Sequence, residues 1–293
     1  MPTLDSVTRG KKFKAFVYGH FKTGKTAGAL TLPRVNVIDF DRGTDVAIAP
    51  WWQAKFGISP SAIQVSELVK DKTNSRGVPT EYAMYDTACK YFDAWMSPSR
   101  VDQFDTWVID SLTSLSEAAR NKGVILLGGT ALAGKPLSFT HKSALETGIV
   151  IPKMQDYGAE RSLLEQFIDM VLSTDKHVVV IAHAKEEWAG EGNDAKLVGY
   201  VPMLVGQSVQ RVPLKFNEVY WIELEKSGPV TDAVVRVAPA DDGKLVIKRG
   251  SRMGLPDRTK WDWPSVRDAL KPTWTFSPDG TVPPTTAATA AKE

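Results

Sequence analysis

Eight consecutive residues near the start of the chain have the types and the spacing needed to hold phosphate groups. They are Gly19, His20, Phe21, Lys22, Thr23, Gly24, Lys25 and Thr26, which fit the P-loop pattern G-x-x-x-x-G-K-[ST]. Glycines let the backbone curl so that successive N–H groups point inward and form an anion nest. The lysine can then reach the β- and γ-phosphates of a nucleotide, and the threonine hydroxyl can ligate Mg²⁺. We therefore predict a nucleotide site over residues 19–27, ending at Ala27. His20 and Lys22 either touch phosphate or line the rim of the loop.

Phosphoryl chemistry also needs an acidic residue that holds Mg²⁺ and a carboxylate that positions water. Asp110 follows the apolar run Trp107-Val108-Ile109, as a Walker B aspartate does, and is the candidate metal ligand together with Thr26. The alternative is that Asp110 only caps the helix that follows. Asp41 closes the run that follows the P-loop helix, so its carboxylate could orient or deprotonate the attacking water. Asp39 points the same way along a strand, and both could instead be ordinary loop acids beside Arg42.

His183 completes the set of candidate catalytic residues, with Lys25 and Asp41. It follows the strongly apolar run Val178-Val179-Val180-Ile181-Ala182. A polar side chain at that position would sit beside the γ-phosphate and sense its presence. A single histidine can equally be structural.

The elements that must position these residues alternate along the chain. Apolar runs predict strands over residues 13–18, 34–40, 63–65, 106–110 and 177–182. Helical spacing predicts helices that begin near residue 27 and span 51–56, 81–96, 111–127, 160–172 and 261–270. Strands alternating with helices imply an α/β fold with a mostly parallel sheet flanked by helices. Three later runs, 218–224, 233–237 and 245–248, are close together and predict antiparallel strands added C-terminally.

Composition limits what kind of protein this is. The 293 residues are 43% hydrophobic and 24% charged, which fits a globular domain, and the net charge of +2 suggests no global attraction to nucleic acid. The single cysteine, Cys89, excludes an intramolecular disulfide. We expect a flexible N-terminus over 1–11, one ATPase-type domain over 12–270 and a disordered Pro/Thr/Ala tail over 271–293. No run of roughly 18 apolar residues predicts a membrane span, and no apolar signal region starts the chain.

Taken in order, these motifs resemble those of the RecA-like ATPases. The resemblance is greatest to small phage-encoded, AAA-like members associated with single-strand annealing and recombination, and it covers roughly residues 12–270. Asp156-Tyr157-Gly158, Phe216 to Tyr220 and Arg252 to Pro256 are also similar to that group's pattern. The resemblance implies a RecA-like P-loop NTPase core, ATP and Mg²⁺ as cofactors, and a homo-oligomer, either ring or filament, with nucleotide between subunits. The chain departs from the pattern at Asp41, where the group usually has Glu, and at Asn217, where it commonly has Asp.

In RecA-like proteins two loops after the central strands contact single-stranded DNA, and the matching regions here are 128–158 and 185–212. Their candidate DNA-binding residues are Lys135, Lys142, Lys153, Lys185, Trp188, Lys196 and Arg211. Lysines suit contact with the phosphate backbone, and an aromatic ring suits base stacking. Four acidic residues reduce the net positive charge of the second region. The alternative is therefore that both regions are ordinary solvated loops.

Basic residues from one subunit of such assemblies reach the neighbour's γ-phosphate. Lys248, Arg249 and Arg252 are the candidates here, and a solvated basic turn is the alternative.

Three functions remain open at this point. The first is an ATPase that acts on single-stranded DNA in phage recombination, annealing or replication, in the cytoplasm of a bacterial host. The second is an ATP-gated assembly or loader protein with weak hydrolysis and a protein partner, such as a single-strand-binding protein or another replication or recombination protein. The third, a P-loop kinase of a small substrate, is less favoured because no arginine-rich lid is evident.

Overall fold

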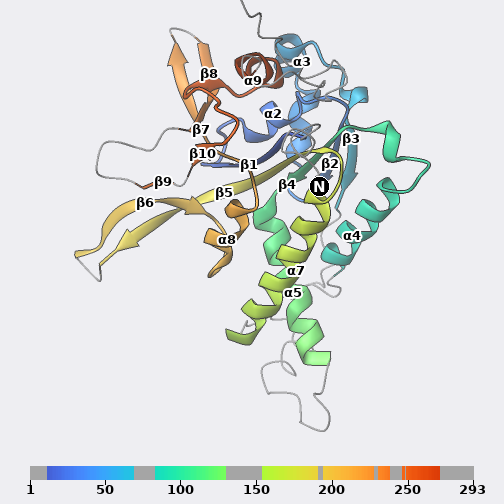
Figure 1. The fold of residues 1–293 in the computed structure, drawn as a ribbon, viewed down its shortest axis with the longest axis vertical. Helices are drawn as coiled ribbons and strands as arrows, with labels where there is room; N and C mark the ends of the chain where they lie inside the picture. Colours follow the sequence, from blue (N-terminus) through green and yellow to red (C-terminus); the bar gives the residue numbers. More distant parts are fainter. Residues whose placement is uncertain are drawn as a thin grey trace, which may run out of the picture.

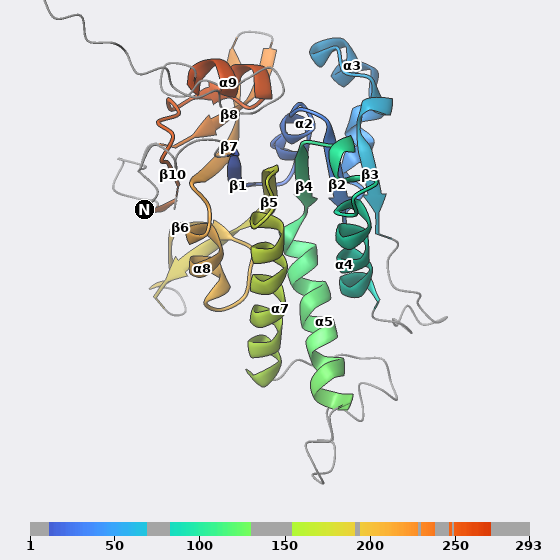
Figure 2. The same cartoon turned by 45° about the vertical axis from the view of Figure 1, so that its right-hand side comes forward.

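The fold was analysed in a computed structural model of the chain, shown in Figures 1 and 2. The structure describes residues 12–68, 83–129, 154–190, 194–227, 230–237, 246–247 and 249–270. The predicted flexible N-terminus and the predicted tail lie outside these residues. Between them, the described strands form one 11-stranded sheet.

The centre of the sheet is parallel and carries the predicted motifs. Its strands, in spatial order, are β3 (Gln64–Glu67), β2 (Val35–Asp39), β4 (Thr106–Asp110), β5 (His177–Ala189), β1 (Lys14–Gly19) and β7 (Glu218–Ser227). β5 therefore lies between the P-loop strand β1 and the strand β4 that ends in Asp110. Because the strands are parallel, their carboxyl ends meet at one edge of the sheet, where ligands gather in open α/β sheets.

Antiparallel strands extend the sheet beyond β7. They are β8 (Val230–Arg236), which pairs with β7, β10 (Gly250–Ser251), which also pairs with β7, and β11 (Thr259–Lys260), which pairs with β8. This confirms the predicted α/β fold class, a mostly parallel sheet flanked by helices with antiparallel strands added C-terminally. The prediction is wrong for the last run, because β9 (Val246–Ile247) pairs in parallel with β6 (Lys196–Pro202) and not with its neighbours in sequence.

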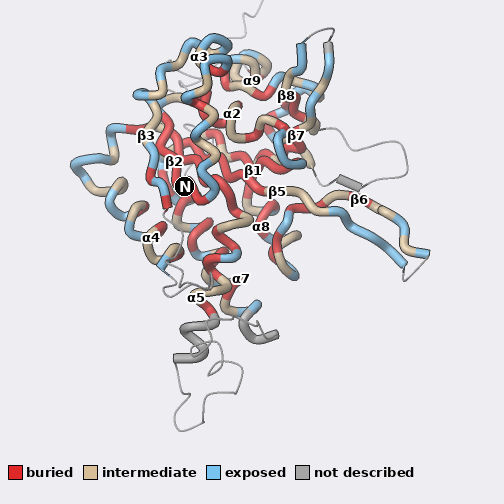
Figure 3. Tube along the Cα trace, turned by 180° about the vertical axis from the view of Figure 1, so that it is seen from behind, coloured by how far each residue is buried: buried red, intermediate tan, exposed pale blue. Residues whose placement is uncertain are grey.

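Helices cover both faces of the sheet because its central strands are apolar on both sides. On one face lie α4 (Met84–Trp95), α5 (Leu112–Gly129), α7 (Met154–Leu172) and α8 (Ser208–Leu214), and on the other lie α2 (Lys25–Ala29), α3 (Pro50–Phe56) and α9 (Trp263–Leu270). β1 supplies both cores: Phe16 and Tyr18 enter the first, and Ala15 and Val17 enter the second. Figure 3 shows the central strands of the sheet as the most buried part of the molecule.

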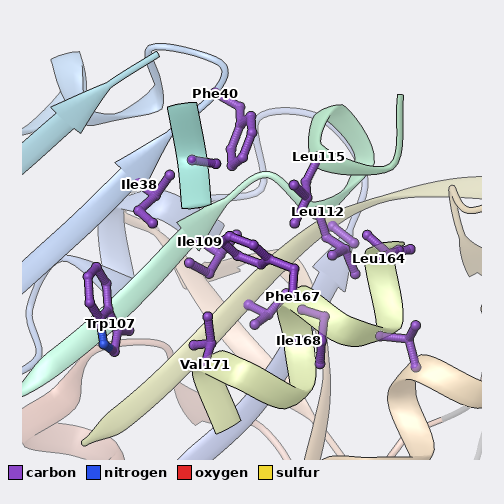
Figure 4. Close-up of a cluster of buried hydrophobic side chains, with 14 of the residues drawn as sticks. Ile38, Phe40, Trp107, Ile109, Leu112, Leu115, Leu164, Phe167, Ile168 and Val171 are labelled. Carbon is purple, nitrogen blue, oxygen red and sulfur yellow. The ribbon is translucent and has the colours of Figure 1, made fainter. Parts of the chain in front are cut away.

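The core on the α5–α7 face fixes the strand that carries Asp110. Ile109 on β4 packs among Leu112 and Leu115 of α5 and Phe167 of α7, as Figure 4 shows. This packing holds the end of β4 and the start of α5 in one place.

Two elements are longer than the sequence predicts. β5 does not end at Ala182 but continues to Ala189, and its extension forms a hairpin with β6 that projects from the sheet (Figure 1). The polar residues of this extension break the apolar pattern, yet the backbone pairs with β6 regardless of side-chain type. α7 begins at Met154, so Asp156, Tyr157 and Gly158 lie inside the helix and not before it. Among the described residues, no helix is long and apolar enough to cross a membrane.

Candidate nucleotide-binding site

A pocket of about 480 Å³ lies at the carboxyl edge of the parallel strands. It brings together five residues that sequence analysis selected from four separate segments: Lys25, Thr26, Asp41, Asp110 and His183. The P-loop residues Phe21 to Gly28 line the same pocket. Its volume is within the range typical of small-molecule sites, roughly 300–1,000 Å³.

The backbone of the P-loop is tightly curled. Gly24 adopts a left-handed conformation (φ 84°) at the N-cap of α2, which a residue with a side chain would adopt at a cost. The Thr23 hydroxyl donates to the carbonyl oxygen of His20 at 2.9 Å, closing the loop. The backbone N–H groups at the start of α2 are consequently available for an anion.

Lys25 is held inside this loop. Its ammonium group donates to the carbonyl oxygens of Gly19 (3.1 Å) and His20 (2.6 Å), and only 5% of the residue is exposed. Burial lowers the pKa of Lys25 to about 8, although the Asp110 carboxylate acts in the opposite direction. A phosphate group would therefore meet an ammonium that has already lost most of its water.

Thr26 and Asp110 meet as the predicted metal ligands should. The Thr26 hydroxyl donates to Oδ2 of Asp110 at 2.6 Å. Burial raises the pKa of Asp110 to about 6, the nearby Asp39 and Asp41 raise it further, and the Thr26 hydrogen bond and Lys25 oppose them.

These two residues fit Mg²⁺. They are hard oxygen donors, and Mg²⁺ usually takes only one or two carboxylates from the protein and completes its shell with water and phosphate. Gly43 leaves room for a cation and its ligands, because a Cβ at this position would lie 2.5 Å from Asp110 Oδ2 and 3.2 Å from Thr26 Oγ1. Among the described residues, no group of three or more His, Cys, Asp or Glu side chains forms a separate metal cluster.

Asp41, the predicted catalytic carboxylate, and Asp39, which is predicted to point the same way, have different surroundings. Asp39 is fully buried and accepts hydrogen bonds from the backbone N–H groups of Asp41, Gly43 and Thr44, at 3.0–3.1 Å. Its carboxylate thus holds the loop after β2 in shape. Asp41, by contrast, lines the pocket with its carboxylate partly exposed.

The Asp41 carboxylate is oriented by three side chains. The hydroxyl of Ser111 donates to Oδ2 at 2.6 Å, the hydroxyl of Ser114 donates to Oδ1, and Nε2 of His183 lies 3.7 Å from Oδ2. Burial raises the pKa of Asp41, but the nearby His183 ring and the hydrogen bonds from Ser111 and Ser114 outweigh it and hold the pKa below its usual range. The carboxylate is therefore ionised at neutral pH and fixed in direction.

His183 faces the pocket from β5, between β1 and β4. Its backbone N–H donates to the Thr113 hydroxyl at 3.0 Å, and its ring lies 6.3 Å from the exposed ring of Phe21. β5 runs on through this residue into the projecting hairpin, so a single strand connects His183 to Trp188.

His20 differs from the other P-loop residues because its side chain does not line the pocket. Its ring packs edge-on against Tyr200 (4.6 Å between centroids) and Trp221 (5.1 Å). Lys22 and Phe21 stay at the rim, with the Lys22 ammonium 5.4 Å from the Phe21 ring centroid.

Two tryptophans hold the P-loop helix from outside. The indole N–H of Trp261 donates to the carbonyl oxygen of Lys25 at 2.8 Å, and that of Trp52 donates to Ala27 at 2.9 Å. Trp261 lies so close to Gly28 that a Cβ there would come within 2.2 Å of its Cδ1 atom. α2 has only five residues, so few hydrogen bonds within the helix stabilise it. The two tryptophans therefore hold it in place.

The structure places only part of the predicted DNA-binding set. Lys135, Lys142 and Lys153 lie outside the described residues. The Lys185 ammonium donates to the carbonyl oxygen of Leu204 at 2.7 Å, and Arg211 lies 3.2 Å from Glu165. Trp188 (55% exposed) and Lys196 are exposed on the β5–β6 hairpin, where Trp188 Nε1 donates to Glu186 at 3.0 Å. The described residues of the region 185–212 include the paired strands β5 and β6 and the start of α8, where a loop was predicted.

The three basic residues proposed to reach a neighbouring subunit also differ in surroundings. Lys248 lies outside the described residues. Arg249 is half-buried near the Arg236, Glu223 and Asp257 charges of its own chain, and Arg252 is exposed. Of the two described residues, Arg252 is the more accessible to a partner.

Sequence analysis missed the residues at the other end of the pocket. They are Val46, Trp51, Lys55, Phe56, Leu224, Thr231, Asp232, Ala233, Lys260, Trp261 and Asp262. No local motif marks them, because they come from segments far apart in the chain. Ser111 and Ser114 could have been found from their position directly after Asp110 and one turn further along α5.

One family model matches part of the chain. Residues 11–124, which include the P-loop, Asp41 and Asp110, match a family model described as "AAA domain". Residues 11–124 are thus similar to an AAA-type P-loop domain. No curated protein matches the chain.

Several solved structures are weakly similar. They include the KaiC-like protein PH0186 from Pyrococcus horikoshii OT3 (12% identity, 93% of this chain, 89% of that chain, TM-score 0.38). Others are the RadB recombinase (13% identity, 82% and 93%, TM-score 0.37) and the flagellar accessory protein FlaH from Methanocaldococcus jannaschii (8% identity, 81% and 82%, TM-score 0.31). At these values the similarities carry no argument about function, which must come from the site itself.

Proposed function

We propose that this protein binds ATP with Mg²⁺ and hydrolyses it in the pocket described above. The observation that carries the proposal is that one pocket holds a P-loop lysine, a Thr–Asp oxygen pair and an oriented, ionised carboxylate. These are the parts that phosphoryl transfer to water requires.

The roles follow from the geometry. Lys25, already desolvated, binds the β- and γ-phosphates, and the N–H groups of the P-loop bind their oxygens. Thr26 and Asp110 would hold Mg²⁺, which neutralises charge on the phosphates when it is bound. Asp41, held by Ser111 and Ser114, accepts a hydrogen bond from the attacking water and takes its proton. The His183 ring lies beside Asp41, so the position of His183 changes when the pocket is occupied. His183 transmits that change to β5, the strand that carries it.

The test is phosphate release by the purified protein with ATP and Mg²⁺. We expect hydrolysis that stops when Mg²⁺ is chelated and that is absent from the Lys25→Ala variant. Wild-type turnover in Lys25→Ala would overturn the proposal.

We also propose that the partner is single-stranded DNA, met during phage recombination, annealing or replication. The β5–β6 hairpin supports this, because it presents Trp188 and Lys196 on the strand that passes the pocket at His183. An aromatic ring beside a lysine suits base stacking and phosphate contact. A movement of His183 on nucleotide binding would then change the position of the hairpin.

A protein partner is the second candidate, and the charge of the same hairpin favours it. Glu186 and Glu187 are exposed beside Trp188, and Lys185 and Arg211 already have partners. ATP hydrolysis measured with and without single-stranded DNA separates the two. A rate that rises with DNA in the wild type and less in Lys196→Ala supports the first candidate, and an unchanged rate supports the second.

A further inference from the structure

The carbonyl group of His20 carries two hydrogen bonds of the P-loop, although the His20 side chain does not line the pocket. Its oxygen accepts from the Lys25 ammonium at 2.6 Å and from the Thr23 hydroxyl at 2.9 Å. The Gly19 carbonyl oxygen accepts a second hydrogen bond from the same ammonium, at 3.1 Å. An ammonium has three donors, so one remains for a phosphate oxygen, and the two carbonyl groups set its direction. The orientation of the His20 peptide group therefore decides where Lys25 points.

The loop that contains this peptide group needs support from outside. Lys22 has φ 61° and Gly24 has φ 84°, and a residue with a Cβ such as Lys22 adopts this left-handed conformation at a cost. Phe21 is 74% exposed and Lys22 is also exposed, so little packing holds the tip of the loop. The indoles of Trp52 and Trp261 bind carbonyl oxygens of α2, which begins after the loop.

Two aromatic rings hold the side chain of His20. Its ring lies edge-on to Tyr200, with 4.6 Å between centroids and an interplanar angle of 85°, and edge-on to Trp221, at 5.1 Å and 83°. Tyr200 and Trp221 stack on each other at 5.5 Å, so the three rings form one cluster. Aromatic pairs of this kind stabilise beyond the area that they bury. His20 is exposed, so these two rings fix its position without a surrounding core.

The two rings that hold His20 come from different parts of the molecule. Trp221 is 3% exposed and pairs across the sheet with Tyr18, which lies directly before the P-loop. Tyr200 lies on β6 and pairs with Glu186 of β5, within the hairpin that projects from the sheet (Figure 1). The sheet therefore fixes one ring, and the β5–β6 hairpin brings the other.

We propose that His20 is a positioning residue for Lys25: Tyr200 and Trp221 hold its ring, and its carbonyl oxygen thereby directs the ammonium toward bound phosphate. This inference rests on the proposed nucleotide binding. Because Tyr200 belongs to β6, the place of the hairpin against the P-loop sets the affinity for phosphate. The P-loop pattern accepts any residue at the position of His20, so the motif alone does not assign this role.

The test is a double-mutant cycle on ATP affinity, measured by titrating ATP with Mg²⁺ into the full chain. His20→Ala removes the ring and leaves the carbonyl group and the rest of the P-loop in place. We expect His20→Ala and Tyr200→Ala each to weaken ATP binding by roughly 3- to 10-fold, the size of one aromatic pair. The double variant should lose no more than the weaker of the two, because both changes remove the same contact. His20→Phe and Tyr200→Phe keep a ring in each place and should bind ATP as the wild type does.

Leu197→Ala is the matched control. Leu197 lies on the same strand as Tyr200 but opposite Trp188, in the projecting part of the hairpin. Its loss disturbs the hairpin and leaves the three rings in place, so ATP affinity should not change. The free energy of unfolding is measured for each variant by denaturant titration. Because His20 is exposed, His20→Ala should remain folded, and its loss of affinity then reports positioning and not stability.

The outcomes separate this inference from the proposed function. The inference is overturned, while ATP binding stands, if either alanine variant binds ATP as the wild type does or if the two losses multiply in the double variant. It is also overturned if His20→Phe is as weak as His20→Ala, or if Leu197→Ala is as weak as Tyr200→Ala. If the wild type does not bind ATP with Mg²⁺, the proposed function itself fails, and the inference fails with it.

Discussion

Burial favours the neutral forms of Lys25 and Asp110. It therefore lowers the pKa of Lys25 and raises the pKa of Asp110. The pKa of Lys25 falls to about 8, and that of Asp110 rises to about 6. Both groups must be charged to bind phosphate and Mg²⁺. The pH interval in which both are charged is therefore narrow and lies between these two values.

We expect the affinity for ATP with Mg²⁺ to be greatest between about pH 6 and pH 8. As pH falls below about 6, Asp110 gains a proton and loses its attraction for Mg²⁺; as pH rises above about 8, Lys25 loses its proton and its attraction for phosphate. Binding titrations from acid to alkaline pH measure this. Asp110→Asn is the control. ATP itself gains a proton in acid, but only the wild type should show the further loss of affinity that comes from protonation of Asp110. A flat wild-type profile would contradict the assignment.

Asp41→Asn should stop turnover while ATP still binds, because the carboxylate acts on water and not on the nucleotide. We expect phosphate release to fall by roughly 100- to 10,000-fold, as for the loss of a general base. Phosphate release and ATP binding are measured on the same sample.

Asp39→Asn is the comparison for that variant. It should lower the free energy of unfolding, because Asp39 holds the N–H groups of Asp41, Gly43 and Thr44. If Asp41→Asn hydrolyses ATP normally, the catalytic carboxylate lies elsewhere.

At the scale of elements, the P-loop helix depends on contacts from distant segments. α2 has five residues, and the indoles of Trp52 and Trp261 bind its carbonyl oxygens. Trp263 adds a hydrogen bond from its backbone N–H to the Thr31 hydroxyl at 2.7 Å. The helix keeps its place because α3 and the segment before α9 hold it, not because of its own length.

Gly28→Ala should therefore destabilise the protein and weaken ATP binding. The new Cβ would lie within 2.2 Å of Trp261, which cannot move without breaking its hydrogen bond to Lys25. We expect a loss of about 1–3 kcal/mol in the free energy of unfolding, measured by denaturant titration. Gly250→Ala is the control, because a Cβ there meets nothing within 4 Å, and it should change stability by less than about 0.5 kcal/mol. Equal stability of the two variants would show that Trp261 does not restrain α2.

The sequence predicts the parts of this molecule that have a local pattern. β1 and β4 are continuous apolar runs that end in a P-loop and an aspartate, so both the strands and the candidate residues at their ends could be found. The extension of β5 could not, because the polar residues at its end pair through the backbone alone. The pocket-lining ion pairs of Asp232 with Lys55 and Lys260 could not be predicted either, because these residues become neighbours only when the sheet is complete.

At the scale of the whole molecule, Arg252 is an exposed basic residue that directly follows β10. We expect assembly of several copies when ATP and Mg²⁺ are present, and hydrolysis per molecule that rises with protein concentration. Light scattering and rate measurements over a dilution series test this. Arg252→Ala should lower the rate and leave ATP affinity unchanged. A constant rate per molecule and a monomer at every concentration would contradict it.

The hydrogen bond from Trp261 to Lys25 joins residues that are 236 positions apart. A ribosome makes the P-loop well before it makes the indole that secures that loop. A nascent chain that has emerged as far as residue 258 therefore has every residue of the phosphate-binding motif without this support. For this reason, ATP should bind firmly only to chains that have emerged beyond Trp261, and shorter chains should not compete for it.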